Sequence, residues 1–283
     1  MDGHRTASHR HEAKKVPPYR VECVESKIKH TRLHYSRFLL TPLEERHAKT
    51  IDILLRRTLL GGIEGTAFTS VCFENREIRD ECTAIEGLYE TVGVVLDNLR
   101  GVVLRGIPTG SQHAFAHKTG PAILTAGDIQ LPPGVECVDP DQLIATLVQP
   151  IELKLRISVE RGKNYENQQV EPQDATSLPI DPVFMPVSRV DSKLCEVPSS
   201  RLLDTNVLHA SNPPYGLQPH PDNHLLPSSH QPFGRKHTAF YMLFLEVETN
   251  GSVSPQHALE QASHIITELM RPLCPQAPAS QQA

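Results

Sequence analysis

Apolar residues recur at helical spacing in the first third of the chain. The repeat follows i, i+3, i+4, i+7 and i+8, and its members are Ile51, Leu54, Leu55, Thr58 and Leu59. Thr50 belongs to the residue types that cap helix N-termini, and Gly61 and Gly62 suit the end of a helix. The pattern therefore predicts an amphipathic helix from about residue 50 to residue 60.

Two adjacent arginines, Arg56 and Arg57, fall beside this apolar stripe rather than opposite to it. In one reading their guanidinium groups meet carboxylates of a partner protein. In the other, their aliphatic stems lie along the helix and their charged ends reach water. The pattern alone leaves both readings open.

Alternation of apolar and polar residues predicts strands elsewhere. The expected strand regions are 19–43, 67–79, several short segments between 102 and 159, and 239–248. Two more helices are expected, at about 86–99 and 255–273. For the last helix, Ser254 is the expected cap and Pro255 the first residue. Its apolar stripe consists of Ala258, Leu259, Ala262, Ile265, Ile266, Leu269 and Leu273.

Three segments lack such patterns. Residues 1–18 and 275–283 are expected to be tails, and 188–237, rich in proline and histidine, is expected to be a disordered insertion. A segment with few apolar residues cannot offset the entropy of ordering by burial. The remaining chain is long enough for about two domains.

Composition narrows the class of protein. The 283 residues carry a net charge of −5 and no tryptophan, so neither bulk charge nor a base-stacking surface favours nucleic-acid binding. No run of about 18 apolar residues is present, which predicts no contact with a membrane interior. The six cysteines are scattered without a C-x-x-C motif and are expected to be reduced thiols.

The sequence contains no candidate catalytic residue. No nucleophile elbow, phosphate-binding loop or dinucleotide fingerprint occurs in the sequence. Three histidine pairs could in principle bind a metal; they are His9 with His11, His113 with His117, and His220 with His224. None has the cysteine or carboxylate spacing of a zinc site, so neither a metal nor a cofactor is expected in this chain.

Several motifs occur in a characteristic order. They are the Arg56-Arg57 helix with its GGIEG end, the segments 85–87 and 98–101, LTAGDI at 124–129, VERGKNY at 159–165, IDPVFMPV at 180–187 and ETNGS at 248–252. In this order the chain resembles the alpha subunit of bacterial-type multisubunit RNA polymerase in its plastid form. The resemblance covers about residues 19–187 and 238–272.

The resemblance implies an α+β fold of two domains. A discontinuous dimerisation domain would comprise 19–65 and 185–274, and a mostly β domain, 66–184, would be inserted into it. Family members form a homodimer that binds the beta and then the beta-prime subunit. Catalytic magnesium belongs to beta-prime, so this chain would be a non-catalytic part of a nucleotidyltransferase and would meet DNA only through the holoenzyme.

The resemblance also implies residue roles. The beta-binding surface would contain Arg56, Arg57 and Leu60, and the beta-prime surface Arg100 and the segment from Ile180 to Val187. The implied dimer contacts are Ile51, Leu54, Leu55, Leu59, Leu259, Ala262, Ile266 and Leu269.

Relatives continue into a helical DNA-binding domain, and none is expected in this chain. The expected location is the plastid. Two other readings remain: a polymerase-derived homodimer that no longer assembles, and a metal-buffering protein that uses its histidines.

Overall fold

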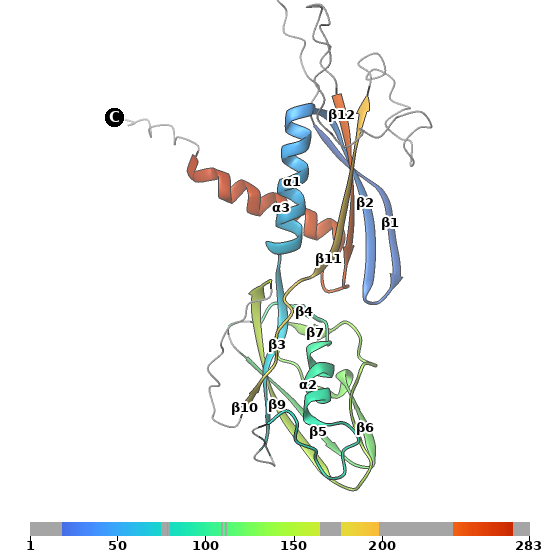
Figure 1. The fold of residues 1–283 in the computed structure, drawn as a ribbon, viewed down its shortest axis with the longest axis vertical. Coiled ribbons are helices and arrows are strands. Elements are labelled where there is room, and N and C mark those ends of the chain that lie inside the picture. The colour runs from blue at the N-terminus through green and yellow to red at the C-terminus, as the bar shows by residue number, and fades with distance from the viewer. Residues whose placement is uncertain are drawn as a thin grey trace, which may run out of the picture.

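A computed structural model describes residues 19–74, 78, 80–108, 110, 112–164, 177–197 and 240–273. The predicted tails at 1–18 and 275–283 lie outside these residues. The described residues form helices packed on antiparallel sheets, which confirms the α+β fold class (Figure 1). No described helix has the length and apolar character needed to cross a membrane.

The first domain is built on an antiparallel sheet that, in the described chain, has the order β1-β2-β12-β11. Its strands are β1 (Arg20–His30), β2 (Leu33–Glu44), β11 (Val187–Val197) and β12 (Phe240–Thr249). The helices α1 (Glu45–Gly61) and α3 (Pro255–Met270) pack on one face, and the short helix η4 (Arg271–Leu273) follows α3. Phe38, Leu43, Leu59, Leu243 and Ala258 lie in the core between sheet and helices.

The second domain lies between α1 and β11 in the chain. Its described sheet has the order β5-β9-β3-β4-β7, and β10 pairs with β3. Its elements are β3 (Glu64–Phe73), α2 (Val92–Arg100), β4 (Leu104–Gly106), β5 (Gln112–Thr119), β6 (Ala122–Thr125), η1 (Ala126–Asp128), β7 (Val135–Cys137), β8 (Leu143–Leu147), β9 (Glu152–Lys163) and β10 (Ser177–Pro179). Strands β6 and β8 pair with each other in a separate two-stranded sheet. Helix α2 contributes Val95 and Leu99 to the hydrophobic core of this second domain.

Figure 1 shows the two domains end to end, with β3 and the approach to β11 running between them. Each domain has its own large buried core. The chain therefore crosses from one domain to the other twice, first after α1 and again before β11. At the junction these crossings bring β3 and the segment before β11 close to the end of α2.

The predicted start holds for α3 and is wrong for the other two helices, whereas the predicted ends of α1 and α2 lie within one residue of Gly61 and Arg100. Ser254 Oγ accepts from the His257 amide at 3.2 Å, and Pro255 is the first residue of α3, both as predicted. In contrast, α1 begins at Glu45, so Thr50 is internal and its hydroxyl donates to the Arg46 carbonyl. The start predicted for α2 near Glu86 is wrong, because Leu88 bridges to β8 and the helix begins at Val92.

The predicted disordered insertion is wrong in its first ten residues. Residues 188–197 belong to β11 and pair with β12 along its whole length, from Arg189 opposite Glu248 to Val197 opposite Phe240. Val190, Cys195 and Val197 bury their side chains in the sheet, which stabilises this strand. The rest of the predicted insertion, 198–237, lies outside the described residues.

Candidate functional site

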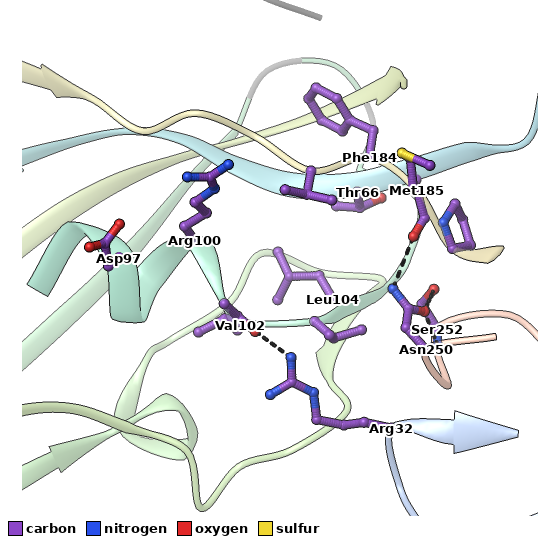
Figure 2. Close-up of a pocket in the computed structure, with 15 residues that line it drawn as sticks. Arg32, Thr66, Asp97, Arg100, Val102, Leu104, Phe184, Met185, Asn250 and Ser252 are labelled. Carbon is purple, nitrogen blue, oxygen red and sulfur yellow. Dashed lines mark hydrogen bonds between the residues drawn. The ribbon is translucent and has the colours of Figure 1, made fainter. Parts of the chain in front are cut away.

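A cleft of about 440 Å³ opens at the junction of the two domains. Asp97 and Arg100 line it from α2, Thr66 from β3, and the segment 183–186 from the second chain crossing. The first domain contributes Arg32, Asn250 and Ser252. Figure 2 shows these side chains arranged around the cavity.

The segment 183–186 is held in place by backbone packing and hydrogen bonds. Phe184 is buried, and a Cβ at Gly65 would lie 2.5 Å from the Phe184 carbonyl oxygen, so the two crossings touch directly. Asn250 donates through Nδ2 to the Met185 carbonyl at 3.3 Å and through its backbone amide to the Pro186 carbonyl at 2.9 Å. The glycine is needed because any side chain would push the crossings apart.

Arg100 is the last residue of α2, and its side chain points from that helix toward β3 (Figure 2). A cation in the last turn of a helix is favourable because the helix dipole is negative there. Among the described residues Arg100 has no hydrogen-bond or ion-pair partner, and it is only half-buried. Its guanidinium can therefore donate to a carboxylate or carbonyl oxygen of another protein.

The opposite wall of the cleft is polar and fixed. Arg32 donates to the Gly101 carbonyl at 2.7 Å and to Gln142 Oε1 at 3.2 Å. Close by, the Cys137 thiol donates to the Asp139 carbonyl, and burial raises the pKa of that thiol. Burial therefore favours the neutral thiol over the thiolate.

Two other residues implied for the beta-prime surface are core residues. Ile180 is 3% exposed in the core of the inserted domain, and Val187 is fully buried in the core of the first domain. A partner could reach the half-buried Val183 and Met185 between them more easily. The contact role of the segment stays a prediction. Asp181 is its exposed residue, and Val183 and Met185 are the half-buried residues that line the cleft.

The two arginines of α1 differ in their surroundings. Arg56 donates to Ser192 Oγ on β11 and lies 3.8 Å from the Asp52 carboxylate. Arg57 is exposed and has no partner among the described residues. Leu60, one turn from Arg56, is half-buried and packs on the core. Arg57 is therefore the residue of this group that is most available to a partner.

The residues implied for the dimer contact divide into two groups. Leu55, Leu59 and Ala262 are buried inside the subunit, and Ile51, Leu54, Leu259 and Ile266 are half-buried. Leu269 is 66% exposed, on the part of α3 that projects away from the sheet in Figure 1. The apolar stripe of α3 thus packs in the subunit's own core around Ala262 and is exposed at Leu269.

A groove of about 400 Å³ lies beside the first half of α3, where Leu259 belongs to the stripe. Val21, Phe38, Leu40, Leu55 and Leu259 contribute most of its apolar surface. The prediction of the dimer helices did not include this groove, because it needs β1 and β2 as well as the helices. The alternation of Val21 and Cys23 in β1 was the available signal.

The histidine pairs add no metal site within the described residues. There, no group of three His, Cys, Asp or Glu side chains could hold a metal ion. His113 approaches the Ser158 hydroxyl, and His117 Nε2 lies 2.7 Å from a Glu152 carboxylate oxygen. The other two pairs, at 9–11 and 220–224, lie outside the described part of the chain.

Comparison with protein families defines the class of the second domain. Residues 67–185 match the model of the RNA polymerase Rpb3/RpoA insert domain. The match begins in β3 and ends at Met185, at the second chain crossing.

Individual relatives extend the similarity beyond that domain. The chain is 37% identical over 250 residues to a DNA-directed RNA polymerase subunit alpha from Adiantum capillus-veneris, and 38% identical over 251 residues to that of Arabidopsis thaliana. The alignments cover 88% and 89% of this chain and 61% and 65% of the relatives. The chain thus spans a little under two thirds of the length of the relatives it matches. Residues 67–185 thus match the insert-domain family, and the aligned part of the chain is similar to DNA-directed RNA polymerase alpha subunits.

Proposed function

We propose that this chain is a non-catalytic assembly subunit of a plastid DNA-directed RNA polymerase. In this role it forms a homodimer, and the dimer binds the beta and beta-prime subunits. The observation that carries the proposal is the interdomain cleft, because Arg100 and the segment 183–186 are about eighty residues apart in sequence and line one cavity. The plastid location is supported by the land-plant relatives.

The surfaces suit a scaffold with several partners. The exposed end of α3 and the apolar groove beside the first half of that helix favour a second copy of the chain, since an isologous dimer places the same patch on both subunits. Arg57, which has no partner within the described part of the chain, offers a guanidinium on α1 for the beta subunit. The cleft offers a second guanidinium, Arg100, for the beta-prime subunit.

Nucleotidyl transfer would then take place in the other subunits. The proposed magnesium ion is held by beta-prime, and this chain contributes to the reaction by bringing beta and beta-prime together. Its residues bind and orient proteins; none is assigned to a proton or phosphoryl transfer.

The experiment is affinity purification of the tagged chain from the native organelle. Recovery of beta and beta-prime in stoichiometric amounts supports the proposal. Recovery of the homodimer alone indicates a polymerase-derived protein that no longer assembles. Zinc that co-purifies and survives mild chelation would favour the metal-buffering reading instead.

A further inference from the structure

Each domain has an arginine that donates a hydrogen bond to a backbone carbonyl of the other domain. Arg32, in the turn between β1 and β2, donates to the Gly101 carbonyl at 2.7 Å and to Gln142 Oε1 at 3.2 Å in the inserted domain. Arg105, on β4 of the inserted domain, donates to the Gly251 carbonyl at 2.8 Å in the turn before α3. Hydrogen bonds from a charged donor are among the stronger ones, and a backbone carbonyl is fixed by its own element.

The turn at Gly251 is packed between the two arginine contacts. Its φ is +88°, and a Cβ there would lie 2.2 Å from the Thr31 carbonyl oxygen and 3.1 Å from Val138 Cγ1. Thr31 precedes Arg32 in the first domain, whereas Val138 follows β7 in the inserted domain. The turn therefore touches both domains at a point that has no room for a side chain.

The Arg32 contact also reaches the helix that carries Arg100. Gly101 is the C-cap residue of α2 and follows Arg100 directly. Gln142, the second acceptor of Arg32, donates in turn to the Asn98 carbonyl at 2.9 Å. Arg32 and Gln142 together satisfy two carbonyls at the end of α2, where helices leave acceptors unpaired. The first domain thus holds the helix end from which Arg100 enters the cleft (Figure 2).

We infer that Arg32 and Arg105 are positioning residues that lock the angle between the domains. The lock keeps the cleft at the width at which Arg100 and the segment 183–186 reach one partner together. With one of these contacts alone, the domains could still rotate about it. Two separate contacts beside the two chain crossings fix the orientation of one domain relative to the other. The effect on partner binding rests on the proposed function, but the effect on the interdomain angle does not.

The test uses the full chain with Arg32 and Arg105 both replaced by glutamine. Glutamine keeps much of the length and removes the charge. The matched control is Arg189→Gln, because Arg189 is exposed on β11 and pairs with Asp191 on the same strand. A third variant with lysine at 32 and 105 restores the charge with a single donor group.

Geometry is read by pulsed EPR between one label in each domain. The sites are native Cys82, exposed in the inserted domain, and Lys27→Cys, on the exposed edge strand β1. Cys23, Cys137 and Cys274 are replaced by serine, and labelled chains are diluted with unlabelled ones so that distances within one chain dominate.

The inference predicts a single narrow distance in the parent and the control, and a distribution at least twice as wide in the glutamine variant. Lysine should narrow it again. Affinity for beta-prime should fall on the order of tenfold in the glutamine variant, while the dimer mass is unchanged. Should the double glutamine variant not fold, the single variants Arg32→Gln and Arg105→Gln carry the same comparison, because each removes one of the two contacts; each should broaden the distribution less than the pair.

The outcomes separate the two ideas. An unchanged, narrow distance in the glutamine variant overturns the lock, even if Arg100→Ala still abolishes beta-prime binding. A broadened distance with full beta-prime affinity overturns the link between the angle and binding. If Arg100→Ala binds beta-prime normally, the proposed role of the cleft fails, while the distance measurement still decides the lock.

Discussion

Replacing Leu269 with alanine should weaken the homodimer without weakening the fold. Leu269 is 66% exposed on the projecting part of α3, so its side chain contributes little to the subunit's own core. In the proposed dimer it would be covered. The variant therefore separates assembly from folding better than a change at half-buried Ile266 would.

The magnitude follows from the exposed fraction. Full burial of a leucine side chain is worth about 1.5–3 kcal/mol, so burying the remaining two thirds contributes about 1–2 kcal/mol. A symmetric dimer contains the residue twice, which gives about 2–4 kcal/mol. Since about 1.4 kcal/mol corresponds to a tenfold change, the dimer dissociation constant should rise on the order of a hundredfold.

Sedimentation equilibrium measures the dissociation constant, and thermal unfolding of the monomeric fraction measures the fold. The matched control is Ile123→Ala, because Ile123 is 56% exposed on β6 of the inserted domain, away from α3. An unchanged dimer in the Leu269 variant, or an equal loss in the control, would refute the placement of the interface on α3.

Three further outcomes are expected. Arg57→Ala should weaken beta binding by about 2–5 kcal/mol in a pull-down titration with no change in melting temperature; full affinity would favour the reading in which the guanidinium only reaches water. Because Lys118 lowers the pKa of Asp128, the stabilisation from this carboxylate is present above about pH 4 and is lost as the pH falls through the folded-state pKa. Asp128→Asn should therefore cost about 1 kcal/mol in urea unfolding at pH 7 and almost nothing at pH 2, and an equal cost at both would contradict this reasoning. Gly65→Ala should lower the melting temperature by several degrees because its Cβ would lie 2.5 Å from the Phe184 carbonyl oxygen, and an unchanged value would show that the crossings are not tightly packed.

The sequence predicted elements best where a local signal and a periodic stripe agreed. For α3, the Ser254 cap, the Pro255 start and the apolar stripe all indicated the observed helix. For α2, the stripe was read back to Glu86, but Gly87 adopts a φ of +89° and Leu88 pairs with β8. Tertiary pairing there overrides the helical pattern.

Strand β11 shows how composition misleads near a boundary. Residues 188–197 were grouped with the proline-rich stretch that begins at Pro198, although they contain no proline themselves. Their burial depends on pairing with β12, which is more than forty residues away in sequence. A composition window cannot detect such a long-range partner.

The candidate site could be predicted only in part for the same reason. Arg100 and the segment 180–187 came from the family resemblance, not from periodicity. Arg32 and Arg105 belong to no sequence pattern that predicts their roles, because each donates a hydrogen bond to a backbone carbonyl of the other domain. Their roles follow from the placement of the domains, which no local signal encodes.

If the interdomain cleft binds the beta-prime subunit, Arg100→Glu should release that subunit, because it puts a carboxylate where the cleft now offers a guanidinium. The chain is co-expressed with plastid-type beta and beta-prime subunits from the same organism, and the assembled masses are measured by native mass spectrometry. For the parent we expect a complex of two copies of this chain with beta and beta-prime, and for Arg100→Glu a complex that retains beta but loses beta-prime. A variant that retains beta-prime as fully as the parent would contradict this expectation.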